Sequence, residues 1–197
     1  MTKPVALLDA NVFPPVWLLD VLLTMDEHQV FDAVWSQRIL EEVRRAMIDR
    51  LRRNQKEIEN FMDCFISMNP THCVYGWESS EMMLKLPDAD DRHVLAAALV
   101  ADADYIVTYN LKDFPQAELQ KYSIAAVHPD VFLCEMFDVN RNSMLRVMNE
   151  VVESKDNPPR TMAEEIAHLR SLRLCEFPNG CGIAAGCVHE VDIRCRA

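Results

Sequence analysis

Hydrophobic positions fall into two patterns along the chain. In the first pattern, three or four apolar residues follow one another and end at a polar residue, as in "VALLD" at 5–9. Such a short run is typical of a strand that is buried on both faces, as in a parallel sheet. Strands are predicted at residues 5–8, 30–36, 73–77, 104–110 and 124–127.

In the second pattern, apolar residues recur every three or four positions and predict helices. The most regular stripe runs from Leu40 to Leu51, and Ser36 is placed to cap this helix at its N-terminus. Apolar residues up to Phe65 continue the stripe, on the same helix or on a second one. Helices are predicted at residues 14–28, 36–65, 88–103, 128–137, 140–152 and 161–174.

The alternation of strands and helices in the first part of the chain predicts an α/β fold with a mainly parallel sheet. The pattern then changes to two consecutive helices, and Thr161 with Glu164 forms a capping-box motif before the second of them. We therefore divide the chain into a domain at 1–138, a helical extension at 139–176 and a cysteine-containing tail at 177–197.

Composition indicates a globular protein of the cytoplasm. Half of the 197 residues are hydrophobic and 26% are charged, which favours a buried core over disorder. The apolar segment at 12–25 is broken by Pro14, Pro15 and Asp20, and the N-terminus lacks a signal peptide. Seven scattered cysteines argue against a disulfide framework. We expect a cytoplasmic protein with no membrane association.

Four of these cysteines lie near the C-terminus with His189, in the spacing C-x5-C-x5-C-x-H-x5-C. Specific zinc sites use cysteine pairs two residues apart, which this spacing lacks. We expect a tail with incidental cysteines rather than a structural metal.

The net charge of −11 argues against broad, non-specific binding of nucleic acid. It is compatible with a local basic patch and with an acidic pocket that binds a metal ion.

Acidic and amide side chains follow the predicted strands or begin a predicted helix, where ligands of parallel sheets bind. They are Asp9 after the first strand, Asn110 and Asp113 after the fourth, and Asp88, Asp90 and Asp91 at the helix start. Carboxylates gathered in one pocket repel one another unless a proton or a cation lies between them. Oxygen ligands without histidine or thiolate favour Mg²⁺ or Mn²⁺, which suits hydrolysis of a phosphodiester.

Three segments resemble successive motifs of a PIN domain, and the likeness covers residues 4–135. They are "LLDANVF", "SQRILEEV" and "DADDRHVLAAALVADADYIVTYNLKDF". Within that family the chain is similar to VapC-type toxins, some of which carry a two-helix extension like this one. The resemblance implies a three-layer α/β/α fold, ribonuclease activity on RNA, inhibition by a cognate antitoxin protein, and a homodimer.

The resemblance also implies which residues are catalytic. Asp9, Glu42 and Asp91 match the metal-binding acids of the family motifs. The family often has its fourth acid at the position of Asn110, and Asp113 is a common substitute. We therefore expect Asp9, Glu42, Asp91 and Asp113 to bind the metal.

Three polar residues near these acids are assigned to substrate binding: Asn11, Thr108 and Asn110. Asn11 matches a small polar residue that steadies the first acid or the substrate. Thr108 fits either a contact to a ligand carboxylate or phosphate, or the ordinary composition of a strand.

Each acid also has a plainer interpretation. Asp9 could cap the turn after its strand, and Glu42 could be a solvated helix acid, since it lies off the apolar stripe. At least one of Asp88 and Asp90 is expected to cap the helix start, which leaves Asp91 to face the metal.

Other polar residues have no matched partners in the sequence. We interpret His93, His128 and His168 as structural or surface residues, although His93 follows Asp91 closely enough to lie near the pocket. Asp104 is expected in a turn.

Seven basic residues are concentrated on one predicted helix: Arg38, Arg44, Arg45, Arg50, Arg52, Arg53 and Lys56. They form either a solvated face balanced by neighbouring acids, or a surface for the RNA backbone that leads to the site. In the second interpretation Arg44 and Arg45 bind substrate.

The leading hypothesis is a Mg²⁺- or Mn²⁺-dependent endoribonuclease of the toxin class. The alternative is a PIN scaffold that binds RNA or a protein partner without cutting, because Asn110 replaces an acid. An aspartyl phosphatase with Asp9 as nucleophile is disfavoured, since such enzymes commonly keep a second Asp where this chain has Asn11.

Overall fold

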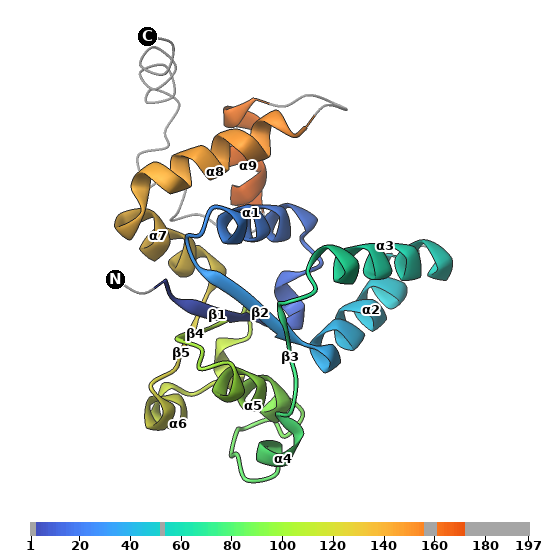
Figure 1. The fold of residues 1–197 in the computed structure, drawn as a ribbon, viewed down its shortest axis with the longest axis vertical. Helices are drawn as coiled ribbons and strands as arrows, with labels where there is room; N and C mark the ends of the chain where they lie inside the picture. The colour runs from blue at the N-terminus through green and yellow to red at the C-terminus, as the bar shows by residue number, and fades with distance from the viewer. Residues whose placement is uncertain (1–2, 52–53, 156–160, 172–197) are drawn as a thin grey trace. The chain divides into compact units, whose positions relative to one another are not determined.

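A computed structural model describes residues 3–51, 54–155 and 161–171. Five strands form one sheet in the order β3-β2-β1-β4-β5, and every pair is parallel (Figure 1). The strands are β1 Val5–Leu8, β2 Asp32–Ser36, β3 Cys73–Val74, β4 Tyr105–Val107 and β5 Ala125–Val127. The α-helices are α1 Val16–Glu27, α2 Gln37–Leu51, α3 Gln55–Met68, α4 Glu78–Glu81, α5 Arg92–Val100, α6 Gln116–Leu119, α7 Pro129–Val139, α8 Arg141–Glu153 and α9 Met162–Ser171.

The predicted α/β class, with a parallel sheet and C-terminal helices, is confirmed. The central strand β1 pairs with β2 on one side and β4 on the other, so that Leu7 lies opposite both Val34 and Ile106. Ala6, Leu7 and Leu8 are fully buried although successive side chains point to opposite faces. This burial explains why the run is apolar without alternation.

The chain forms two compact units. The first comprises residues 1–16 and 31–128, and it contains the sheet and helices α2 to α6. The second comprises residues 17–30 and the chain from Pro129 onward, and it contains α1 and helices α7 to α9. The domain boundaries expected from the sequence remain a prediction.

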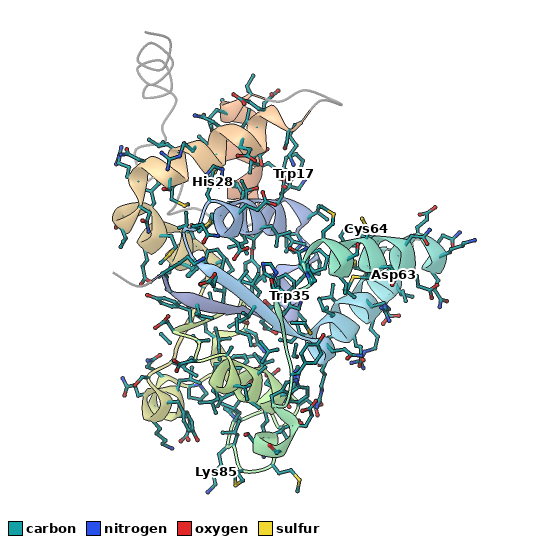
Figure 2. The ribbon with its side chains drawn as sticks, viewed as in Figure 1. Trp17, His28, Trp35, Asp63, Cys64 and Lys85 are labelled. Carbon is teal, nitrogen blue, oxygen red and sulfur yellow. The ribbon has the colours of Figure 1, made fainter. Side chains whose placement is uncertain are left out.

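In the first unit, an aromatic cluster joins β2 to α3. The ring of Trp35, which is labelled in Figure 2, lies with its centroid 5.8 Å from that of Phe13 and 5.0 Å from that of Phe65. All three side chains are buried. The cluster therefore fixes α3 against the sheet, because aromatic pairs at such spacings add to the stability gained from burial.

The second unit is stabilised by polar contacts around α1 and α8. Lys155 forms an ion pair with Asp20 and lies over the Trp17 ring, 4.7 Å from its centroid. Nε2 of His28 lies 2.6 Å from Oε2 of Glu150. Apolar residues of α8 are buried, among them Met144, Val147, Met148 and Val151.

Several predicted helix boundaries change. The prolines at 14 and 15 precede α1. The long stretch at 36–65 forms two helices, α2 and α3. Asn54 caps α3, because its side chain accepts from the backbone N–H of Lys56 at 3.0 Å. Ser36 caps α2 as predicted, with Oγ accepting from the N–H of Ile39 at 3.2 Å. The short helices α4 and α6 were not predicted, because four residues are too few for a periodic signal.

The predicted capping box forms at the start of α9. The N–H of Thr161 donates to Oε2 of Glu164 at 2.8 Å, and the N–H of Glu164 donates to Oγ1 of Thr161 at 3.3 Å. The cysteine-containing tail at 177–197 lies outside the described residues. Among the helices that are described, none has both the length and the apolar character needed to cross a bilayer.

Candidate active site

Asp9 directly follows β1 and is held by three hydrogen bonds. Its Oδ1 accepts from the backbone N–H of Ala10 at 2.7 Å, and its Oδ2 accepts from Nδ2 of Asn11 and from Oγ1 of Thr108, both at 2.6 Å. The side chain is 6% exposed. Asp9 therefore caps the short 3₁₀ helix at Ala10–Val12, as one interpretation predicted, while the contacts from Asn11 and Thr108 fix its orientation.

The parallel pairing of β1 and β4 explains why Thr108 meets Asp9. Leu8 lies opposite Val107 in the register, and the N–H of Asp9 donates to the carbonyl of Val107 at 3.1 Å. Asp9 and Thr108, which follow Leu8 and Val107, therefore lie at the same edge of the sheet. Thr108 is fully buried, which requires its hydroxyl to have a partner.

Asn11 and Asn110 extend this network. Nδ2 of Asn11 also donates to Oγ1 of Thr108 at 2.9 Å, and its Oδ1 accepts from the N–H of Tyr109 at 3.0 Å. The N–H of Asn110 donates to Oγ1 of Thr108 at 2.9 Å. The two loops that follow β1 and β4 are thereby joined through side chains.

Asn110 holds Asp113 in place. Its Nδ2 donates to Oδ2 of Asp113 at 2.6 Å, and Nζ of Lys112 lies 3.7 Å from the same oxygen. Asp113 ends the 3₁₀ helix at Leu111–Asp113. The amide at position 110 thus orients a nearby carboxylate.

Burial raises the pKa of Asp9 above its usual value. The hydrogen bonds from Thr108 and from the N–H of Ala10 lower this pKa, while the charge of Glu42 raises it and His93 lowers it. Burial outweighs the hydrogen bonds, because a carboxylate removed from water loses more solvation than these donors restore.

Asp91 differs from the other two acids of the trio because it is half-buried. It occupies the N-cap position of α5 but its side chain makes no capping hydrogen bond. Burial raises its pKa to about 6, and the charges of Asp9, Asp88 and Asp113 contribute to the rise. Asp91 therefore lies within electrostatic reach of acids from both central strands.

The other two acids of the trio have different roles. Oδ1 of Asp88 accepts from the N–H of Asp90 at 2.9 Å, a turn that delays the start of α5 to Arg92. Asp88 and Asp90 are both exposed. Asp88 therefore caps the turn that precedes α5, and not the helix itself.

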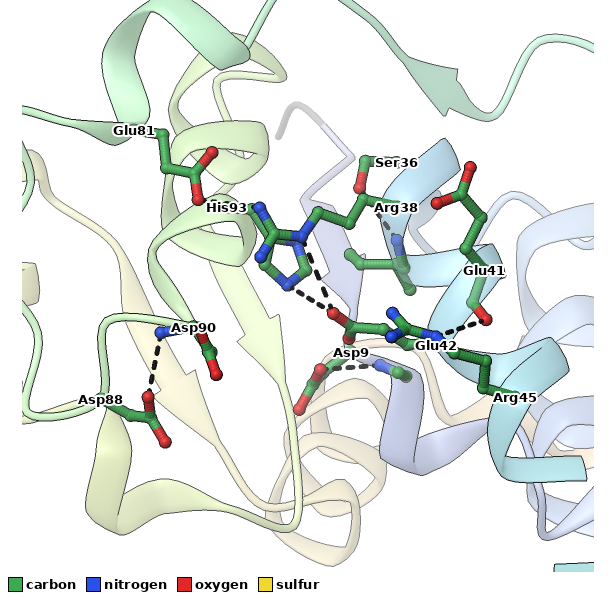
Figure 3. A network of polar contacts seen from close by, with 12 residues as sticks. Asp9, Ser36, Arg38, Glu41, Glu42, Arg45, Glu81, Asp88, Asp90 and His93 are labelled. Atoms are coloured by element: carbon green, nitrogen blue, oxygen red, sulfur yellow. Dashed lines mark hydrogen bonds and ion pairs between the residues drawn. The ribbon is translucent and has the colours of Figure 1, made fainter. Parts of the chain in front are cut away.

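Glu42 projects from α2 toward Asp9, and Figure 3 shows the two carboxylates facing each other. Oε1 of Glu42 lies 3.0 Å from Nε2 of His93 and 3.9 Å from Nε of Arg38. Nη1 of Arg38 lies 2.9 Å from Oε1 of Glu81. Glu42 is thus part of a polar network and not a fully solvated helix acid.

His93 lies in this network, near the predicted site acids, although the sequence did not indicate its contact with Glu42. It is 1% exposed, and it contacts Glu42 from α5. Its position two residues after Asp91 was the available signal. Arg38 and Glu81 carried no comparable signal, because their contact joins α2 to α4 and depends on the packing of both helices.

Of the two basic residues assigned to substrate, Arg45 donates from Nε to the carbonyl of Glu41 on its own helix at 3.4 Å. Nε of Arg44 is buried and has no hydrogen-bond partner within the described part of the chain. Arg44 lines a pocket of about 270 Å³ together with Trp35, Glu41 and Tyr75. The side chains of Arg50, Arg52 and Arg53 lie outside the described residues.

The donor set fits a hard divalent cation, because it consists of carboxylate oxygens, and neighbouring acids raise the pKa values of Asp9 and Asp91. In residues 3–51, 54–155 and 161–171, no three His, Cys, Asp or Glu side chains are already gathered closely enough to ligate one ion. An ion would therefore have to draw these acids closer together as it bound.

Comparison with known proteins identifies two regions. The family model described as PIN domain matches residues 5–112, and the one described as VapC50 C-terminal domain matches residues 129–178. The chain is 35% identical over 109 residues to "Putative ribonuclease VapC50" of Mycobacterium tuberculosis. That match takes in 52% of this chain and 64% of the relative, so less than two thirds of the relative's length is covered. No solved structure matches the chain.

Proposed function

The chain belongs to the PIN-domain family, as its motifs predict, and we propose that it is a divalent-metal-dependent endoribonuclease of the VapC toxin type. The observation that supports the proposal is electrostatic: the charge of Glu42 raises the pKa of Asp9, and the charges of Asp9 and Asp113 raise the pKa of Asp91. The name of the mycobacterial relative supports the same class of activity.

Asp9, Glu42, Asp91 and Asp113 would bind Mg²⁺ or Mn²⁺. When bound, the ion supplies a charge that neutralises an RNA phosphate and lowers the pKa of a water molecule for in-line attack. The hydrogen bonds from Thr108 and Asn11 fix the Asp9 carboxylate before any ligand arrives. This fixation reduces the reorganisation that binding requires.

Asn110 has the corresponding role for Asp113. Its amide donates to Asp113, so the replacement of an acid by Asn at this position removes one negative charge and adds an orienting group. Contacts of Asn11, Thr108 and Asn110 with substrate remain part of the proposal. Their hydrogen bonds to Asp9 and Asp113 give them a role with or without RNA.

Arg44 and Arg45 are proposed to bind the RNA backbone beside this site. Both are on α2, the helix that carries Glu42. Their positive charges would attract phosphates locally although the whole chain has a net charge of −11. A cognate antitoxin protein is the proposed inhibitor, and a homodimer in the cytoplasm is the proposed assembly and location.

Cleavage of labelled RNA by the purified chain in Mg²⁺ tests the activity. Wild-type protein should cut, chelation by EDTA should stop the reaction, and Asp9→Asn should lower the rate to background. Glu41→Gln is the matched control, because Glu41 neighbours Glu42 on α2 but its side chain accepts from Gln37 of the same helix. Equal cleavage by wild type and Asp9→Asn would contradict the assignment.

A PIN scaffold that binds RNA without cutting is the second candidate. Asn110 in place of an acid, and the separation of the acids in the described residues, favour it. Titration with Mn²⁺ distinguishes the two. Binding that Asp9→Asn abolishes supports the nuclease, and no carboxylate-dependent binding supports the scaffold.

A further inference from the structure

The imidazole of His93 is buried at the site, and its Nε2 faces the carboxylate of Glu42. Nε2 lies 3.0 Å from Oε1 of Glu42, and the side chain is 1% exposed. Because an ionised carboxylate only accepts hydrogen bonds, Nε2 carries the proton in this contact. The Trp77 ring, with its centroid 5.9 Å from that of His93, packs on the same side chain.

The other ring nitrogen of His93 is unsatisfied. Nδ1 is buried and has no hydrogen-bond partner among the residues that the structure describes. A buried polar atom without a partner lowers stability, and an apolar side chain of similar size would avoid that cost. Packing alone therefore does not account for a histidine at this position, whereas the contact with Glu42 does.

The contacts on Glu42 are asymmetric. His93 and Arg38 both approach Oε1, and no hydrogen bond to Oε2 is found within the described residues. Arg38 is itself held by Glu81 of α4, so three helices contribute to this arrangement. In Figure 3 the carboxylate of Glu42 lies beside that of Asp9.

Like charges at Asp9 and Glu42 would by themselves drive the two carboxylates apart. The charge of Glu42 raises the pKa of Asp9. The Glu42 side chain has three rotatable bonds and is 30% exposed. Without a partner it would turn to solvent. A fixed donor on the neighbouring helix α5 opposes that rotation.

We propose that His93 is a positioning residue, which orients the Glu42 carboxylate toward Asp9 through Nε2 and thereby prepares the site for a divalent cation. The inference rests on the proposed metal-dependent function. It assigns to His93 an effect on the affinity for the ion that is exerted only through Glu42.

Two variants at position 93 separate orientation from packing. His93→Gln places an amide N–H close to the former Nε2, and His93→Asn places one close to the former Nδ1, out of reach of Glu42. Mn²⁺ affinity is measured by titration calorimetry, with thermal unfolding as the folding control. Removal of a hydrogen bond to a metal ligand typically costs roughly 10- to 100-fold in affinity. We expect a loss of that size for His93→Asn and little loss for His93→Gln.

A second measurement needs no variant at position 93. Nitrogen-15 NMR of the metal-free protein reports the tautomer of His93, and we expect the proton on Nε2. Glu42→Ala should shift the His93 ring signals, and Glu41→Ala should leave them unchanged. Unchanged ring signals in Glu42→Ala would overturn the proposal, even if both variants at position 93 failed to fold.

The outcomes also separate this inference from the proposed function. A wild-type chain that binds no Mn²⁺ overturns the metal-dependent function. A wild-type chain that binds Mn²⁺ as tightly as folded His93→Asn overturns only the positioning role. Equal losses in His93→Gln and His93→Asn also overturn it, because the position of the donor would then be irrelevant.

Discussion

The hydroxyl of Thr108 donates a 2.6 Å hydrogen bond to Oδ2 of Asp9, and so joins the residues that directly follow the two central strands of the sheet. Both side chains are buried. The bond lowers the pKa of Asp9 against the larger effect of burial. Thr108 therefore favours the ionised form of the carboxylate that the proposed metal site requires.

Thr108→Val should destabilise the metal-free protein at neutral pH. The substitution keeps the shape of the side chain but removes the donor, and a hydrogen bond to a charged group contributes about 1.5–3 kcal/mol. Urea unfolding at pH 7.5 measures the change. Thr108→Ser is the control, because its hydroxyl can still donate, and equal stability of the two variants would contradict the prediction.

Metal-free protein should become less stable as the pH rises from about 4 to about 6. The pKa of Asp91 is about 6 in the folded chain and 3.8 in its ordinary state, so the folded chain retains a proton in this range that the unfolded chain has lost. Stability falls with pH wherever the folded state binds more protons. The raised pKa of Asp9 acts in the same direction.

Asp91→Asn should remove its share of this pH dependence. Urea unfolding in EDTA at pH 5.0 and pH 7.5 gives the difference for each protein, and Asp90→Asn is the control because Asp90 is exposed. The drop between the two pH values should be smaller in Asp91→Asn than in wild type. An equal loss of stability between the two pH values in wild type, Asp90→Asn and Asp91→Asn would refute the raised pKa of Asp91.

The same pair of variants decides whether Asp90 or Asp91 binds the ion. Asp91 lies within electrostatic reach of Asp9 and Asp113, whereas Asp90 follows a turn capped by Asp88. Asp91→Asn should weaken Mn²⁺ binding by at least about tenfold. Mutation of a residue that only orients a metal ligand already lowers metal affinity by roughly 10- to 100-fold, and loss of a ligand itself should cost no less. Asp90→Asn should bind as wild type does in calorimetry at pH 7.5.

Replacement of Arg44 and Arg45 by Gln should weaken RNA binding and its dependence on salt. Each contact with a phosphate of single-stranded RNA contributes about 0.7 to the slope of log affinity against log salt. The double variant should therefore lose about 1.4 from that slope, measured by fluorescence anisotropy with uncut RNA in EDTA. Arg146→Gln, which removes an exposed charge on α8, is the control. An unchanged slope would favour the solvated face over the RNA surface.

The strands could be predicted where burial alone determines them. β1 has the predicted boundaries, because four apolar residues stand between a proline and Asp9. β4 is shorter than predicted, since Thr108 uses its hydroxyl in the site and the chain turns after Val107. The helix predicted from residue 88 begins at Arg92, because the Asp88 carboxylate competes with the helix for the N–H of Asp90.

The sequence by itself determined the α/β class, the parallel sheet and the position of acids after the strands, because these follow from apolar runs and from the residues that end them. Only the tertiary structure decided that Nε2 of His93 meets Glu42 and that Arg38 meets Glu81. Those contacts join residues of different helices at a spacing set by packing. No periodicity in the chain encodes the 3.0 Å between Nε2 of His93 on α5 and Oε1 of Glu42 on α2.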